Sequence, residues 1–257
     1  MRFLWLSTTA LIAGAINSIA GGGSLLTFPA LLQAGVLPKQ ANATNTVALL
    51  PGQFTSAAAY REDLRRHHSM LLPLVLAAFA GGIIGARVLM ATHQQQFLHL
   101  VPWLLLLATT LFALGPPLQN LLLQNLHPHN HPTGLRPLAR ILLPIGIFIV
   151  CLYIGFFGAG AGLLIMGVLS FAGVESVHEI NALKATITSV SNTVASLTFI
   201  IFGAVVWRYA LLMMVAASIG GYVCARVVRT RQPRGMRVLI VTLGCIVTAF
   251  LFWKVYR

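Results

Sequence analysis

The chain has 257 residues, of which 58% are hydrophobic and 8% are charged. That charged share is about a third of the share in a soluble domain, so the composition excludes an ordinary soluble protein and indicates a polytopic membrane protein. Seventeen Lys and Arg residues stand against four acidic residues, but the basic residues lie in short gaps between apolar runs. This placement is typical of topology signals that contact lipid headgroups, and we expect no nucleic-acid partner.

The first half begins with an apolar helix expected over about residues 3–20. Three glycines, Gly21-Gly22-Gly23, interrupt it, and the short apolar piece that follows is too short for a bilayer, which needs about 20 residues. The start resembles a signal peptide, but its apolar stretch runs into a glycine break that the second half repeats, so we reject cleavage. The remaining segments of this half are expected over 25–34, 41–60 with a Pro51-Gly52 kink, 70–90 and 97–114.

The second half follows the same order after a region rich in Pro and His. Its glycine break is Gly158-Ala159-Gly160-Ala161-Gly162, and apolar segments are expected over 138–157, 163–171, 180–202, 207–228 and 238–253. The predicted organisation is a first membrane repeat over 1–115, a linker over 116–137 and a second membrane repeat over 138–257.

Three landmarks recur in the same order in both halves. Their offsets are nearly constant: Gly22 and Gly160 are separated by 138 positions, Ala43-Thr44 and Ala185-Thr186 by 142, and Gly81–Val88 and Gly220–Val227 by 139. We therefore predict a duplication.

Charge placement predicts how the two repeats are oriented. The basic loop 61–68 precedes the Gly81 helix, whereas the basic loop 226–237 follows the equivalent Gly220 helix. If both loops are cytoplasmic, equivalent helices run in opposite directions. The predicted fold is an all-α polytopic membrane protein with two inverted repeats, about eight transmembrane helices and two glycine-broken, re-entrant segments.

The glycine breaks are the first candidate binding elements. In hydrocarbon a broken backbone survives only when it is buried in protein or lines a polar cavity. Two breaks at matching positions indicate the central site of a transporter. Each break starts a short helix whose backbone donors suit a small anion. The alternative interpretation is that these glycines only allow close helix packing.

Polar side chains on neighbouring segments are the second candidates. Hydroxyl and amide donors suit an oxyanion, although Ser, Thr and Asn also join helices in lipid, and both interpretations stay open. Lys184 lies about one turn inside an otherwise uncharged span, where it either extends to the interface or meets an anion. The predicted substrate-binding residues are Asn17, Gly21, Gly22, Gly23, Ser24, Thr44, Asn45, Gly160, Ala161, Gly162, Lys184, Thr186 and Asn192.

Other chemistries have little support in the sequence. No expected span contains Asp or Glu in its interior, so neither a cation site nor a proton relay is visible. No nucleophile and base pair, P-loop or HExxH motif is present, and we expect neither enzyme activity nor a cofactor. His127, His129 and His131 could chelate a metal, but prolines are interleaved with them, which favours a solvated linker.

The chain resembles the sulfite exporter TauE/SafE family of bacterial membrane permeases over nearly its whole length. The resemblance is carried by Gly21–Ser24, Asn42–Gly52, Gly155–Gly162 and Asn181–Lys184. It implies a multi-pass permease of the bacterial plasma membrane, with a duplicated fold and no cofactor, for sulfite or related sulfur-containing anions. The Ala161-Gly162 variant of the second motif and the histidine linker depart from the family pattern.

These observations predict export of a small sulfur-containing oxyanion such as sulfite or an organosulfonate. An inside-negative potential supplies about 2.3 kcal/mol per charge per 100 mV for an anion that leaves the cell. The expected partners are that anion and the lipid bilayer, and a homodimer is also considered. The alternatives are a metal-handling protein that uses the histidine linker and an accessory membrane subunit.

Overall fold

The computed structural model describes residues 2–20, 22–59, 68–124, 137–172, 174, 177–227 and 234–257. These ranges contain ten helices and no strand. The helices are α1 (Arg2–Ala20), α2 (Ser24–Gln33), α3 (Pro38–Ala59), α5 (His68–Ala91), α6 (Gln94–Gln124), α7 (Pro137–Phe156), α8 (Ala161–Phe171), α9 (Val177–Ile201), α10 (Trp207–Val227) and α11 (Arg234–Tyr256). The all-helical prediction is confirmed.

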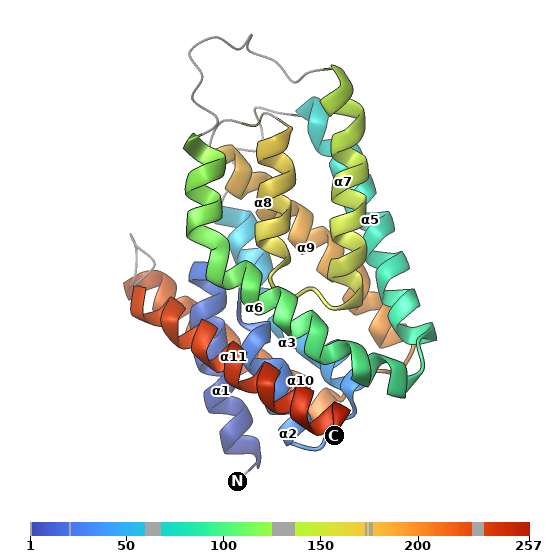
Figure 1. Ribbon diagram of the computed structural model, residues 1–257, viewed down its shortest axis with the longest axis vertical. Coiled ribbons are helices and arrows are strands. Elements are labelled where there is room, and N and C mark those ends of the chain that lie inside the picture. The colour runs from blue at the N-terminus through green and yellow to red at the C-terminus, as the bar shows by residue number, and fades with distance from the viewer. Residues whose placement is uncertain are drawn as a thin grey trace.

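Each glycine break separates a long helix from a short one, as expected. The short helices α2 and α8 have 10 and 11 residues, about half of what a bilayer crossing needs. In Figure 1, α8 runs from the middle of the molecule toward its upper end, whereas α2 runs toward the lower end. The two short helices thus leave the central region in opposite directions.

The apolar interior is divided into two cores. The smaller core joins α5, α7, α8 and α9 around residues such as Ile147 and Ile165. The larger core joins α1, α2, α3, α6 and α10, together with the ends of α5 and α9, around residues such as Phe28 and Phe97. Each core therefore includes helices from both halves of the sequence.

Close backbone packing joins helices of the first half to helices of the second half. Helix α1 packs along α10, and α5 packs along α7. A methyl group added at Gly14 or Gly220 would overlap the opposite backbone of the first pair. One added at Gly81 would lie 2.6 Å from the carbonyl oxygen of Phe148 in the second pair. Glycines at these positions let the helix axes approach, as is common between helices in lipid.

The outer surface carries large apolar side chains on many helices. Leu4, Leu72, Ile149 and Val215 are each more than half exposed, and an apolar surface of this extent matches a lipid environment better than water. By length and composition, Leu71–Ala91 and Gln94–Leu114 are apolar enough to cross a bilayer, and other apolar helices in the described ranges are shorter.

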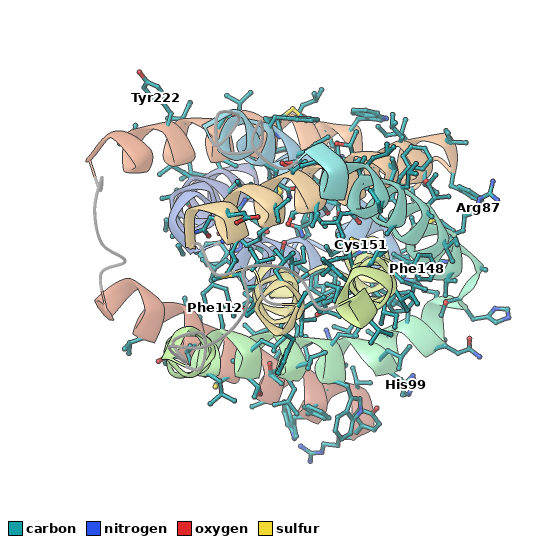
Figure 2. All side chains as sticks on the ribbon, turned by 90° about the horizontal axis from the view of Figure 1, so that it is seen from above. Arg87, His99, Phe112, Phe148, Cys151 and Tyr222 are labelled. Carbon is teal, nitrogen blue, oxygen red and sulfur yellow. The ribbon has the colours of Figure 1, made fainter. Side chains whose placement is uncertain are left out.

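Some polar and charged side chains toward helix ends point outward. Figure 2 places Arg87, His99 and Tyr222 at the periphery of the molecule and Cys151 inside it. Arg87 is exposed near the end of α5, a position that suits an interfacial anchor.

One predicted boundary is wrong by about ten residues. The segment expected to end at Leu114 belongs to α6, which continues through Pro116-Pro117 to Gln124. Three good helix formers, Leu121–Leu123, follow the two prolines and extend the helix into the predicted linker. The linker histidines His127, His129 and His131 lie outside the described residues.

Candidate functional site

The second break has a defined backbone path. Gly158 and Gly160 have φ angles of +79° and +76°, a conformation that costs a residue with a Cβ about 1–2 kcal/mol. The amides of Phe157 and Gly158 both donate to the carbonyl of Tyr153, at 2.8 and 3.0 Å. This pattern ends α7 with a glycine in the left-handed region, and α8 begins three residues later.

The first break follows a tighter path. Gly23 precedes α2 with φ −54° and ψ −34°, which are helical values. A methyl group at Gly23 would lie 2.7 Å from the carbonyl oxygen of Ala13 and 3.2 Å from Cβ of Asn17. The first break therefore folds back onto the helix that precedes it, and glycine is required there by space rather than by backbone angle.

Part of the backbone donor set expected at the breaks is already engaged. The amide of Leu25 donates to Gly22, and those of Ala161 and Leu163 donate to Gly158 and Gly160. By the geometry of a helix start, the amides of Ser24 and Gly162 have no intrahelical acceptor. The donors on which an anion could draw are thus fewer than the glycine motifs suggest.

Three predicted residues meet at the first break. Asn17 is half-buried beside Gly23, and a methyl group at Gly52 would lie 4.0 Å from its Nδ2. Asn45 is buried in α3, and its amide oxygen accepts a hydrogen bond from the hydroxyl of Thr27 on α2. The Pro51-Gly52 part of α3 and the start of α2 therefore lie beside this break.

Lys184 lies beside the second break. Its Cδ is 3.6 Å from the position that a methyl group on Gly162 would occupy. Its Nζ donates to Oδ1 of Asn181 at 2.8 Å and lies 3.9 Å from Sδ of Met166. The head group thus contacts Asn181, one turn earlier in α9, and Met166 on α8, and both of these partners are neutral.

The remaining predicted residues make contacts of two kinds. Thr44 is fully buried, and its hydroxyl accepts a hydrogen bond from the amide of Val206 at 3.0 Å, in the segment before α10. Thr186 and Asn192 donate to carbonyls one turn back in α9, those of Ala182 and Thr188. These hydrogen bonds lie within α9 or toward α10 rather than at a break. Gly21 lies outside the described residues.

Helices of the first half also cover the second break. The ring of Phe28 on α2 packs edge-on against Phe157, with 5.3 Å between ring centroids. Gly160 packs against Ala108 of α6. Asn42 of α3 donates from Nδ2 to the carbonyl oxygen of Phe156 at 3.1 Å. The second break is therefore held within the protein at the boundary between the two cores.

A second polar contact joins α3 to α9. Ser189 donates to the carbonyl oxygen of Gln53 at 3.1 Å, one residue beyond Pro51-Gly52. Asn17 of α1 lies next to Gly52, so this part of α3 contacts both α1 and α9. Helix α3 is therefore the element that connects the surroundings of the two breaks.

Several residues of this region were not among the predicted site residues. Asn42, Tyr153 and Asn181 all contact the second break or Lys184. A sequence signal was present for two of them, because an Asn-Ala pair occurs at Asn42-Ala43 and at Asn181-Ala182. The residue three positions after each Asn, Asn45 or Lys184, contacts the short helix of its own half.

A metal site has no support in the described part of the chain. Those residues contain no cluster of three or more His, Cys, Asp or Glu side chains that could hold a metal ion. Cys151 is buried and Cys245 is exposed, and both are free thiols.

Comparisons with known proteins identify the family. Residues 6–251 match the family model described as Sulfite exporter TauE/SafE. The chain is 32% identical over 244 residues to the probable membrane transporter protein ORF9 of Sinorhizobium sp., which covers 93% of this chain and 88% of that protein. It is 28% identical over 249 residues to the probable membrane transporter protein YfcA of Escherichia coli K12, with coverage of 95% and 87%.

A more distant relative aligns over almost its full length. The probable membrane transporter protein YunE of Bacillus subtilis is 25% identical over 264 aligned positions, which cover 95% of this chain and 97% of that protein. No solved structure gives a significant match. From its helical architecture, its apolar exterior and these alignments, the chain belongs to the sulfite exporter TauE/SafE family of membrane transporters.

Proposed function

We propose that this protein exports a small sulfur-containing oxyanion, such as sulfite or an organosulfonate, across the bacterial inner membrane. The observation that carries the proposal is Lys184, a cation that lies beside the start of α8 and whose described partners are neutral. A lysine in this position is costly unless it extends to the interface or meets an anion. The family name supports the choice of sulfite as the first substrate to test.

In this proposal the anion passes between the two breaks. The amides of Ser24 and Gly162 are first-turn donors, and helix starts attract negative charge. Asn17 and Asn45 supply amide groups on the side of the first break, and Lys184 supplies positive charge on the side of the second. Thr44, Thr186 and Asn192 belong to the neighbouring polar faces and support the helices that bear these groups.

We further propose that the fold consists of two inverted repeats with about eight transmembrane helices and two re-entrant segments. Reciprocal packing supports this: α1 of the first half packs on α10 of the second, and the equivalent α7 packs on α5. The opposite directions of α2 and α8 in Figure 1 support it as well. Relative motion of the two cores then exposes the region between the breaks alternately to each side.

Electrostatics supports export as the direction of transport. An anion that leaves a cell with a negative interior moves down the electrical potential, which contributes about 2.3 kcal/mol per charge per 100 mV. Export therefore requires no dedicated coupling site. In the described helices, an acidic residue occurs only in the first turn of α9, and the helix interiors contain neither Asp nor Glu. This agrees with transport that is not coupled to a cation.

Flux in a purified system tests the proposal. The protein is reconstituted into liposomes that are loaded with radiolabelled sulfite, and efflux is compared with that from protein-free liposomes in parallel with sulfoacetate, sulfate and chloride. Efflux of a sulfur-containing oxyanion that saturates with concentration and accelerates when the interior is made negative is expected. Efflux equal to that of protein-free liposomes for every sulfur anion contradicts the substrate class.

A further inference from the structure

The carbonyl at the end of α7 is held by a side chain of the other half of the protein. Phe156 is the last residue of α7, and the last carbonyls of a helix have no intrahelical donor. Nδ2 of Asn42 donates to this carbonyl at 3.1 Å, and Asn42 is only 1% exposed. A residue of α3 thus fixes the point at which the second break begins.

A second hydrogen bond holds the middle of the same break. The hydroxyl of Tyr153 donates to the carbonyl oxygen of Ala159 at 2.7 Å. Tyr153 also accepts, through its own carbonyl, the amides of Phe157 and Gly158. One side of the turn is therefore bound to α7 through Tyr153, and the other is bound to α3 through Asn42.

These two hydrogen bonds bracket the residues that precede the start of α8. The carbonyls that they hold, those of Phe156 and Ala159, lie on either side of Gly158, and Gly160 follows immediately. Because Gly158 and Gly160 can adopt many backbone angles, the direction of the amides after them depends on what fixes the neighbouring carbonyls. Apolar contacts of Phe157 with Phe28 restrain the same turn but set no direction for a carbonyl group.

We propose that Asn42 and Tyr153 are positioning residues of the transport site: they do not touch the anion, but they orient the break so that the Gly162 amide and Lys184 face it together. This inference rests on the proposed function above. It assigns a defined task to two residues that lie in different halves of the sequence and are buried or partly buried in the protein.

The first measurement uses transport by the full-length protein in liposomes. Asn42→Leu removes the donor with similar side-chain volume, and Tyr153→Phe removes a single hydroxyl. For each variant the sulfite KM is expected to rise about tenfold, the effect of losing roughly one good hydrogen bond, with less than a threefold change in the maximal rate. Thr198→Val is the matched control, because that buried hydroxyl donates to Val194 within its own helix, and its KM stays within twofold.

The double variant tests whether both residues act on one structure. If they orient the same turn, the fold increase in KM of the double variant Asn42→Leu/Tyr153→Phe is well below the product of the fold increases of the two single variants. When either Asn42→Leu or Tyr153→Phe is combined with Thr198→Val, the fold change in KM is expected to equal the product of the two separate fold changes. A multiplicative effect of Asn42→Leu and Tyr153→Phe contradicts a shared role.

Hydrogen exchange gives a readout that does not depend on transport. In both variants the amides of residues 157–162 are expected to exchange at least about tenfold faster than in the original protein, whereas those of the second half of α8 are unchanged. Unchanged exchange at the break in both variants overturns the positioning role, and Tyr153→Phe decides the matter if Asn42→Leu does not fold. If exchange at the break is faster in the variants but the original protein transports no sulfur anion, the proposed function is overturned and the positioning of the break is not.

Discussion

Replacing Lys184 by methionine removes the ammonium group and keeps an unbranched side chain of similar length. For an anion at the Gly162 amide, at an assumed distance on the order of 6 Å from Nζ and an effective dielectric constant of about 20, the attraction is about 3 kcal/mol. The Lys184 side chain lies beside Gly162, because its Cδ is 3.6 Å from the position of a methyl group added at Gly162. Partial compensation by water leaves an expected increase in the sulfite KM of about 10- to 100-fold.

A second lysine provides the matched control. Lys39 of α3 also has neutral partners, because its Nζ donates to the carbonyls of Met90 at 2.7 Å and Thr92 at 2.8 Å, at the end of α5. Lys39→Met therefore loses a comparable set of hydrogen bonds away from the breaks. It is expected to lower the melting temperature without changing KM.

The assay is initial sulfite efflux from liposomes as a function of internal concentration, at fixed membrane potential. The decisive comparison is between the two lysine variants, measured on protein that retains a single cooperative thermal transition. An equal KM for Lys184→Met and the original protein would refute the assignment of Lys184 to the anion path. An equal increase of KM in both variants would refute the argument that Lys184 acts on the anion because it lies beside the second break.

Four further variants test other parts of the structure. Thr44→Val removes the acceptor for the Val206 amide and is expected to lower the free energy of unfolding by about 1–3 kcal/mol; an unchanged melting temperature would show that this contact is unimportant. Gly160→Ala places a Cβ on a residue with φ +76° and should destabilise the protein by about 1–2 kcal/mol. Gly167→Ala lies in helix α8 with no atom within 4 Å of the new methyl group and should stabilise the protein by about 0.5–1 kcal/mol. Melting temperatures that shift in the same direction in both variants would contradict this difference. Replacing His127, His129 and His131 by alanine should leave sulfite flux unchanged with or without a chelator, and a flux that disappears would favour the metal-handling alternative.

The helices could be predicted closely because the physical signals for them are local. Apolar runs near the length of a bilayer crossing, ended by Gly or Pro, placed most boundaries within about three residues of the structure. Both short helices were expected from a glycine break followed by about ten apolar residues. The end of α6 was missed because Pro116-Pro117 suggested a stop, whereas the leucines beyond them continue the helix.

The arrangement of the helices could not be predicted in the same way. Periodicity indicates which residues avoid lipid, but it does not name the partner helix, so the packing of α1 on α10 and of α5 on α7 had no signal in the sequence. The recurrence of Gly81-Gly82 and Gly220-Gly221 predicted equivalent helices. It did not predict that Gly82 would lie against Ser191 of α9 and Gly220 against Leu11 of α1.

The candidate site shows the same limit at single residues. Residue type identified Thr44 and Asn45 equally well as candidates, because both are polar residues within an apolar span. Only their neighbours distinguish them: Asn45 pairs with Thr27 on α2, and Thr44 pairs with the backbone before α10. For Lys184 the sequence left an anion partner and an extended conformation both open, and the structure places its stem at the break and its head group at Asn181.

Labelling of a cysteine at position 162 tests the central claim most directly. An added Cβ fits there, since it would be 3.6 Å from Cδ of Lys184, and the native residues Cys151, Cys224 and Cys245 are first replaced by serine or alanine. We predict that a membrane-impermeant, negatively charged thiol reagent modifies Gly162→Cys in native membranes and that sulfite slows the reaction, whereas Gly167→Cys on the same helix shows no sulfite protection. Absence of labelling at position 162, or labelling at a rate that sulfite does not change, would contradict an anion path at the second break.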